Sequence, residues 1–436
     1  MILSSSSLLL KITSKQRILL LVTQSRISIK KLDPSLALSG KPQIYSTQER
    51  VRSMHKHFPV NCIVPPHILT NIATKGTDGQ KNLAISTLKT SEQMRGQRQA
   101  LSEFSAAAFR VAVGGKERVI YDAKNGSSLP GTVVRKEGDG ATADVTVNEA
   151  YDGSGYTYDL YNEVYQRNSI DGNGMRLDST VHYRVGYDNA FWDGEQMVYG
   201  DGDENLPVSE RLFNRFTIAL DVIGHELTHG VTQFEAKLTY SQQPGALNES
   251  MSDVFGSLVK QHHLQQAATA ADWLIGQGLL TENVKGVALR SMKAPGTAYD
   301  DPVLGKDPQP GHMKDYVNTL SDNGGVHINS GIPNHAFYII ATELGGYAWE
   351  KAGRIWYVTL KDKLTASSKF QDCANLTYQA AGELFGAGSI EQQAVQKGWA
   401  EVGLPVDGGG TPPPPSDGGG CLEAVLRLVG AAPAKR

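Results

Sequence analysis

The sequence predicts an α+β protein with a β-rich first half and a helical second half. Between about residues 117 and 205, short segments such as RVIYDA, GTVVRK and ADVTV alternate with Gly, Asp and Asn turns, which is typical of strands. From Leu212 onward, apolar residues recur every three or four positions, as on the buried face of a helix. The chain has 436 residues, 40% of them hydrophobic, which is enough for a sizeable core and favours two or three domains.

The charge balance excludes some partners. Lys and Arg total 42 against 45 Asp and Glu, a net charge of -3, so no global basic field favours nucleic acid. No apolar run reaches the roughly 18 residues that a membrane-spanning helix needs. Three scattered cysteines are too few for a disulfide framework or a cysteine-rich zinc site. We therefore expect a protein with neither nucleic-acid binding nor a membrane span.

Both ends of the chain differ from its middle. Residues 1–53 are expected to be an N-terminal extension, either unstructured or a targeting segment, or to precede the true start at Met54. Its apolar stretch is interrupted by Lys11, Lys15 and Arg17, so there is no clear signal peptide. Residues 405–436 are expected to be a Gly/Pro linker and tail, because DGGGTPPPPSDGGG combines flexible glycines with a proline run.

The motif HELTH at 225–229 lies within the first helical pattern. His225 and His229 are four residues apart, so they project from one helix face, about 6 Å apart along the axis, and both can reach one metal ion. Glu226 lies one position further round, where a carboxylate can take a proton from a metal-bound water. The alternative is an amphipathic helix with two surface histidines.

The next helical pattern supplies a third metal-binding candidate. GALNESMSDVFG at 245–256 places Glu249 twenty residues after His229 and Asp253 one turn later on the same face. Two histidines and one glutamate are a standard ligand set for catalytic zinc, with the fourth position left for water. Asp253 can accept a hydrogen bond from a metal-binding histidine and fix its tautomer, or it is an ordinary solvated helix carboxylate.

Several motifs together carry a resemblance to a known family. From about Tyr121 to Leu404 the chain resembles the thermolysin-like zinc metalloproteases, and most closely their protealysin-type branch. This resemblance implies a two-lobed zincin fold. A β-rich lobe over 108–236 would include the zinc-binding helix, a helical lobe would span 237–404, and the active-site helix would lie in the cleft between them. The motifs are NAFWDGEQMVYGDGD (189–203), HELTHGVT, GALNESMSDVFG, LRSM (289–292) and DNGGVHINSGIPNHAFY (322–338).

The resemblance also implies roles for single residues. It implies a zinc endopeptidase in which His225, His229 and Glu249 bind Zn²⁺ and Glu226 is the general base. The residues that match the family's oxyanion donors are His327 and Tyr240, with Asp322 orienting His327. A catalytically inactive relative that binds peptides or a partner in the same groove is the alternative.

Substrate contacts follow from the same resemblance. Asn189, Ala190 and Trp192 match the strand edge that pairs with an extended peptide, and Arg290 matches the arginine that binds a substrate carbonyl. Read alone, these residues are an edge-strand polar residue, core packing and a solvated cation. An apolar pocket is implied for the residue after the cut, so we expect cleavage before bulky apolar side chains; its matching residues are Val222, Ile275 and Leu289.

Residues 54–107 are expected to be a pro-segment that blocks the site as an intramolecular inhibitor. VPPHIL at 64–69 resembles the Pro-Pro-x-x-Leu stretch of protealysin-type pro-segments, and Ala106 to Ala108 are a candidate cut region. The alternative is a disordered linker. A Cys62 thiolate that binds the zinc in the latent form is a further hypothesis, although a lone cysteine is more often inert.

The resemblance is incomplete at the double calcium site of thermolysin. The matching positions hold Lys260, Leu274 and Gln277 beside Asp221 and Asp272, and an ammonium group would repel Ca²⁺, so no double-calcium site is expected. Relatives are typically exported, which predicts secretion, but without a clear signal peptide intracellular retention is the alternative.

Overall fold

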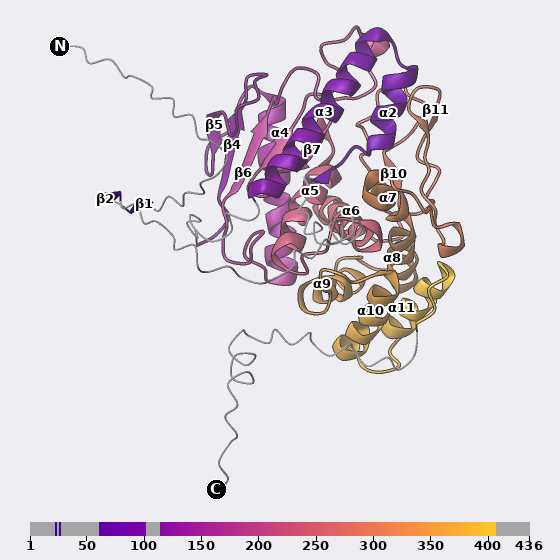
Figure 1. The fold of residues 1–436 in the computed structure, drawn as a ribbon. Helices are drawn as coiled ribbons and strands as arrows, with labels where there is room; N and C mark the ends of the chain where they lie inside the picture. The colour runs from indigo at the N-terminus through magenta and orange to yellow at the C-terminus, as the bar shows by residue number, and fades with distance from the viewer. Residues whose placement is uncertain (1–21, 24–25, 28–60, 102–113, 407–436) are drawn as a thin grey trace, which may run out of the picture. The chain divides into compact units, whose positions relative to one another are not determined.

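The computed structural model describes residues 22–23, 26–27, 61–101 and 114–406 (Figure 1). The chain divides into two units, 1–55 and 56–436. Within the first unit, β1 (Val22–Thr23) pairs with β2 (Arg26–Ile27) in an antiparallel hairpin. Most of the predicted N-terminal extension, and the predicted tail beyond Val406, lie outside the described residues.

A six-stranded mixed sheet forms the centre of the β-rich part of the second unit. Its strand order is β3-β7-β8-β6-β4-β5, with parallel pairing of β4 with β6 and of β6 with β8. The edge strand β3 comes from the predicted pro-segment and pairs antiparallel with β7. The strands are β3 (Asn61–Cys62), β4 (Arg118–Asp122), β5 (Thr132–Lys136), β6 (Leu177–Val181), β7 (Ala190–Trp192) and β8 (Met197–Tyr199).

One predicted strand is wrong. ADVTV begins α4 (Val145–Asp159), which continues as a π-helical turn over Leu160–Val164. Asp144 caps this helix by accepting hydrogen bonds from the N–H groups of Thr146 and Val147. The cap and a buried face through Val147, Ala150 and Tyr151 outweigh the β-propensity of the Val-Thr-Val run.

The two central helices are α5 (Leu220–Phe234) and α6 (Gln242–Leu264). The apolar periodicity that starts at Leu212 is only partly helical, because a 3₁₀ turn (Phe216–Ile218) precedes α5. The two helices pack closely at Gly224 and Gly256: a Cβ on Gly256 would lie 2.4 Å from the Asp221 carbonyl oxygen. The glycines therefore let the motif-bearing faces of α5 and α6 approach each other.

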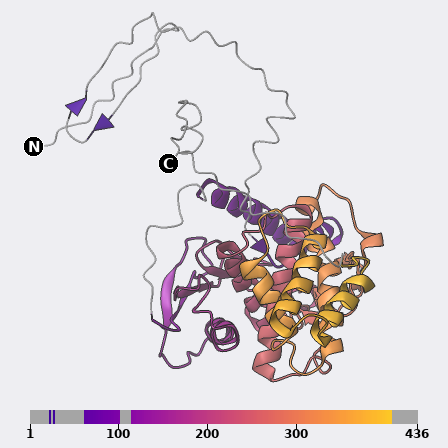
Figure 2. The same cartoon turned by 90° about the horizontal axis from the view of Figure 1, so that it is seen from below.

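The helical part follows α6 and packs beside the sheet-bearing part (Figure 2). Two short antiparallel ladders, β9 (Leu274–Ile275) with β10 (Arg290–Ser291) and β11 (Asp300–Asp301) with β12 (Gly305–Lys306), precede its helices. The two-lobed α+β arrangement is therefore confirmed, with α5 and α6 at its centre. The helices are α7 (Asp322–Asn329), α8 (Gly331–Leu344), α9 (Ala352–Asp362), α10 (Phe370–Phe385) and α11 (Ile390–Glu401).

The predicted pro-segment is folded where the structure describes it. After β3 it forms α2 (Pro66–Lys75) and α3 (Asp78–Leu101), so a disordered linker is the wrong interpretation of this stretch. Asn71 donates to the Leu304 carbonyl and Gln80 to the Glu210 carbonyl, which holds both helices on the rest of the unit. The predicted boundaries at 54 and 107, and the candidate cut region, lie outside the described residues.

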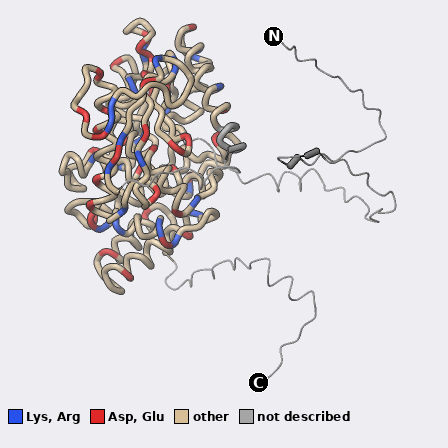
Figure 3. Tube along the Cα trace, turned by 90° about the vertical axis from the view of Figure 1, so that its left-hand side faces the viewer, with Lys and Arg blue, Asp and Glu red and all other residues tan. Residues whose placement is uncertain are grey.

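Charges of both signs are interspersed along the trace (Figure 3), in agreement with the near-neutral balance of the sequence. Among the residues that the structure describes, no helix combines the length and the apolar character that crossing a membrane requires.

Candidate active site

Three side chains from α5 and α6 converge on one point. The His225 and His229 Nε2 atoms are 3.0 Å apart, and the Glu249 carboxylate oxygens lie 3.5 Å from His225 Nε2 and 3.4 Å from His229 Nε2. Bonds of about 2.0–2.1 Å in a tetrahedron give edges of roughly 3.3 Å, so this spacing suits zinc. Glu249 Oε2 is buried and has no hydrogen-bond partner, as expected of a ligand atom. The donor set therefore fits one zinc ion.

The Nδ1 atoms of His225 and His229 each lie within hydrogen-bond distance of other side chains. His225 Nδ1 lies 2.8 Å from an Asp253 oxygen, and His229 Nδ1 lies 2.8 Å from the Asn248 amide oxygen and 3.0 Å from the Ser252 hydroxyl. Both histidines and Asp253 are buried, so the surface alternatives for these residues are wrong. Such contacts leave Nε2 free to bind a metal.

Glu226 lies beside this group and outside it. One of its oxygens accepts a hydrogen bond from the Trp192 N–H on β7 at 3.1 Å. Burial, and then the Glu249 carboxylate, raise the pKa of Glu226 well above its usual value. A buried carboxyl with a raised pKa is suited to exchanging a proton with a neighbouring group.

His327 faces the same group from α7. Its Nδ1 lies 2.6 Å from Asp322, and its Nε2 lies 3.2 Å from the Tyr240 hydroxyl, which also donates to Glu249. Burial acts to lower the pKa of His327, but Asp322 and then Glu249 outweigh it and raise the pKa to about 9. Gly324 and Gly325 adopt φ of 89° and 78°, which turns the chain so that Asp322 lies against the His327 ring. His327 is thus a buried residue and not the surface histidine that its Gly-rich loop suggests.

The strand β3, from the predicted pro-segment, occupies the β7 edge predicted to bind substrate. The Ile63 N–H donates to the Ala190 carbonyl at 3.2 Å, and the Val64 N–H donates to the Asn189 side-chain oxygen at 3.0 Å. The Cys62 carbonyl oxygen lies 3.0 Å from His327 Nε2. A peptide backbone therefore already runs along this edge.

Arg290 lies against the same segment. Arg290 is buried, donates to the Ile63 carbonyl at 3.0 Å and makes a bidentate ion pair with Asp253. The alternative of a solvated cation at this position is wrong, because Arg290 is buried. The side chain of Ile63 belongs to the same buried apolar cluster as Val222, Ile275 and Leu289. The pairing of β10 with β9 places Arg290 opposite Ile275.

Cys62 contributes its backbone to this region. Its side chain packs with Tyr183, Tyr187, Phe191 and Val198 in a second apolar cluster. Among the described residues, the group able to hold a metal consists of His225, His229 and Glu249 without Cys62. The thiolate hypothesis therefore gains no support.

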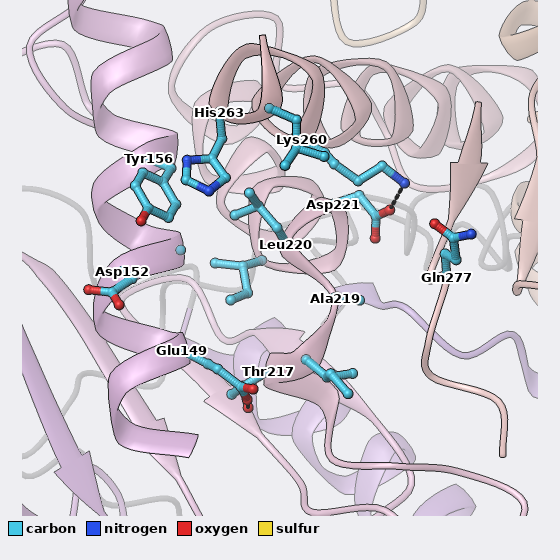
Figure 4. Close-up of a pocket in the computed structure, with 14 residues that line it drawn as sticks. Glu149, Asp152, Tyr156, Thr217, Ala219, Leu220, Asp221, Lys260, His263 and Gln277 are labelled. Atoms are coloured by element: carbon cyan, nitrogen blue, oxygen red, sulfur yellow. Dashed lines mark hydrogen bonds and ion pairs between the residues drawn. The ribbon is translucent and has the colours of Figure 1, made fainter. Parts of the chain in front are cut away.

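At the positions that match the double calcium site of thermolysin, the Lys260 ammonium group lies among the oxygen atoms of Asp221, Asp272 and Leu274. Lys260 Nζ lies 2.8 Å from Asp221, 3.0 Å from Asp272 and 3.1 Å from the Leu274 carbonyl. Lys260 and Asp221 line a cavity of about 390 Å³ between α4, α5 and α6 (Figure 4). The ammonium group supplies the positive charge at this point.

Sequence reasoning missed the supporting polar residues. Asn248 and Ser252 each precede a predicted site residue by one position, so their place in the sequence could have indicated a supporting role. Asn334, which donates to Asp253 at 2.8 Å, and His67, whose Nε2 lies 2.9 Å from the Tyr299 hydroxyl, come from distant segments. Both lie inside quoted motifs, VPPHIL and DNGGVHINSGIPNHAFY, but nothing in the spacing of those motifs indicates Asp253 or Tyr299 as the partner.

A helix-borne pair of histidines, a glutamate from the next helix and an adjacent carboxylate define the class of zinc metallopeptidases. Comparison with known proteins gives the family. Residues 77–233 match the catalytic domain of thermolysin metallopeptidases, and residues 236–404 match their alpha-helical domain. The chain belongs to the thermolysin metallopeptidase family and is of the protealysin type.

Individual relatives cover most of the chain. An extracellular metalloprotease of Pectobacterium carotovorum subsp. carotovorum is 50% identical over 80% of this chain and 98% of its own length. Protease PrtS of a Photorhabdus species is 49% identical over 79% of this chain and 92% of its own. The solved structure of the precursor of protealysin from Serratia proteamaculans is 52% identical, covers 79% of this chain and 99% of that one, and superimposes with a TM-score of 0.71. The match to a precursor supports a pro-segment in this chain.

Proposed function

We propose that this chain is the latent precursor of an exported zinc endopeptidase that cuts peptide bonds before apolar residues. The observation that carries the proposal is the arrangement around one peptide unit. His225, His229 and Glu249 converge, and Glu226 stays outside this set. The backbone of Cys62 and Ile63, which pairs with β7, passes between Glu226 and His327. A bound zinc ion would supply Lewis acidity and an activated water.

Each remaining side chain has a defined part in hydrolysis. Glu226 is the general base, which takes a proton from water and delivers it to the amine that leaves. His327 and Tyr240 donate hydrogen bonds to the oxygen on which negative charge develops, and Asp322 keeps the His327 ring oriented. Asp253 fixes the tautomer of His225.

Substrate would bind as an added strand on β7. Asn189 and Ala190 bind the backbone, Trp192 holds Glu226 in place through its N–H, and Arg290 binds the carbonyl after the cut. The pocket of Val222, Ile275 and Leu289 takes an apolar side chain there. The pro-segment uses these same contacts, which is how it acts as an intramolecular inhibitor.

Export is proposed from the relatives, two of which carry the name extracellular metalloprotease or extracellular minor metalloprotease. Detection of the processed protein in culture medium tests this part separately from the chemistry.

The central test combines activity with metal content. After maturation, the protein should digest casein, and a zinc chelator should abolish the digestion. Glu226→Gln should reduce the rate by about a hundred- to ten-thousand-fold and keep its zinc, because Glu226 lies outside the ligand set. His225→Ala should lose the zinc itself.

Two results would contradict the proposal. If Glu226→Gln loses zinc as completely as His225→Ala, Glu226 is a ligand and not the base. If the mature wild-type protein binds zinc and peptides but digests nothing, the chain is an inactive relative.

A further inference from the structure

The pro-segment lies across the candidate site in one defined direction. Along the chain, the Cys62 carbonyl faces His327, the Ile63 N–H lies against Ala190 and close to Glu226, and the Ile63 carbonyl faces Arg290. The Val64 N–H then meets Asn189. Each polar backbone group from the Cys62 carbonyl to the Val64 N–H therefore has a partner in the site.

One peptide bond within this stretch has both of its polar ends at candidate catalytic groups. The carbonyl side of the Cys62–Ile63 bond lies 3.0 Å from His327 Nε2, where an oxyanion donor belongs. Its nitrogen side donates to the Ala190 carbonyl at 3.2 Å, on the same short strand whose Trp192 N–H donates to Glu226. This is the placement that hydrolysis needs, because the carbonyl oxygen gains charge and the nitrogen must receive a proton.

The side chains around this bond also suit a substrate. Ile63, the residue after the bond, is fully buried in the apolar cluster that contains Val222 and Leu289. The two prolines come at 65 and 66, beyond the bond, so Ile63 and Val64 keep the N–H groups that they use. The prolines therefore leave this bond open to attack.

We propose that the Cys62–Ile63 bond is cut by the same molecule that carries it, as a processing site distinct from the candidate cut region at Ala106 to Ala108. The inference rests on the proposed function. Water adds its oxygen to the Cys62 carbonyl carbon and the C–N bond breaks. Glu226 passes both protons of the water in turn to the Ile63 nitrogen, which leaves a carboxylate on Cys62 and an ammonium group on Ile63.

The cut alone would leave the larger fragment in place. Downstream of the bond, His67 contacts Tyr299, Asn71 donates to Leu304, and Thr77 donates to Glu210. We therefore expect a nicked precursor that still inhibits itself until the remainder of the pro-segment is removed.

The test follows the purified full-length precursor with added zinc. Intact-mass spectrometry and N-terminal sequencing should find a fragment that begins at Ile63. The fraction cut per unit time should stay the same over a hundredfold range of precursor concentration, and a zinc chelator should stop it. Ile63→Asp should reduce the cut at least a hundredfold, because a carboxylate is disfavoured in the apolar pocket. Ile85→Asp, at a position of the same segment that is 40% exposed, should cut as the wild type does.

The outcomes separate this inference from the proposed function. If the matured preparation digests casein but the precursor never shows an Ile63 terminus, the self-cutting is wrong and the proposed function stands. If the fraction cut per unit time rises in proportion to the precursor concentration, one molecule cuts another and the inference fails. If neither casein nor the precursor is cut, the proposed function fails and takes the inference with it. Since Ile63→Asp could prevent folding, the concentration series and the chelator decide the matter on the wild-type chain.

Discussion

Asp253 connects three side chains of the candidate site that come from different parts of the chain. Its two oxygens accept hydrogen bonds from Arg290 and Asn334 and lie against His225. Burial alone would raise the pKa of Asp253, but Arg290 and His225 outweigh it and hold the pKa well below its usual range. The carboxylate therefore stays charged and couples the candidate metal site to Arg290.

Replacing Asp253 with Asn should weaken zinc binding about 10- to 100-fold, because His225 loses a charged acceptor. Competition with a chromogenic chelator measures this affinity. Asp362→Asn, which changes an exposed aspartate on α9, is the matched control and should bind zinc as the wild type does. Equal zinc affinities for the two variants would mean that Asp253 does not position His225 for zinc binding.

The position of Lys260 leads us to predict how calcium affects the stability of the protein. We expect the wild-type melting temperature to be the same with millimolar Ca²⁺ or with a calcium-selective chelator, because the ammonium group occupies the centre of the oxygen atoms. Lys260→Glu should lose roughly 3–5 kcal/mol of stability, since Asp221 loses its cation. Calcium should restore part of that loss.

Lys260→Met is the control for calcium, because it removes the cation without adding an oxygen ligand. Calcium should leave Lys260→Met unchanged. Tight binding of two calcium ions by the wild type in a titration calorimeter would overturn this account of the site.

Among the elements, the α5–α6 contact determines the metal site. Gly256→Ala would place a Cβ 2.4 Å from the Asp221 carbonyl oxygen, so the helices must separate. We expect a loss of about 1–3 kcal/mol in unfolding free energy, with weaker zinc binding. Gly140→Ala has open space around it and should change neither quantity. If Gly256→Ala is destabilised but binds zinc with normal affinity, the close packing of α5 and α6 is not required for the geometry of the metal site.

A histidine joins strand β6 to helix α4. His182, just after β6, lies 2.8 Å from Asp144, the cap of α4, and 2.9 Å from Asp201. The hydrogen bond to Asp201 is the largest influence on the pKa of His182, which rises to about 9 although burial acts against it. Its folded-state pKa thus exceeds the ordinary value of about 6.5.

This raised pKa gives the sign of a pH effect. The stabilisation from charged His182 should be complete below about pH 6.5 and should be lost as the pH rises through about 9, with a size on the order of 2 kcal/mol. Chemical unfolding at pH 6 and pH 10 measures it. His182→Asn tolerates the local φ of 53° and should show a correspondingly smaller difference between the two pH values. An equal difference in both proteins would mean that His182 contributes nothing to the effect.

At the scale of the whole molecule, the metal site joins the two matched domains. His225 and His229 lie in the matched catalytic domain and Glu249 lies in the matched alpha-helical domain, so one ion would bind both. At free zinc about a thousandfold above its dissociation constant, binding adds roughly 4 kcal/mol to stability. Removing zinc should therefore lower the melting temperature by roughly 5–15 °C.

His225→Ala provides the control for this measurement. Its melting temperature should be low and insensitive to zinc, whereas Glu226→Gln should keep the zinc response. A wild-type protein that melts at the same temperature with and without zinc would mean that the ion does not stabilise the folded state.

Much of the site was accessible to sequence reasoning because its residues sit in local patterns. His225 and His229 share a helix face through spacing alone, and the class of fold followed from the change in periodicity near Leu212. The Val-Thr-Val run misled, since its local strand preference is weaker than an Asp cap and a buried helix face. The pro-segment helix α3 escaped prediction because its polar composition gives no strong apolar period.

The sequence by itself determined the ligand types, the helix that carries HELTH and the absence of a carboxylate at position 260, because these depend on residue identity and short-range spacing. Only the tertiary structure decided that Arg290 and Asn334 meet at Asp253, that Cys62 and Ile63 lie between His327 and Glu226, and that Lys260 bridges Asp221 and Asp272. These contacts join residues far apart in the chain, and their geometry depends on how closely packed helices and strands bring them together.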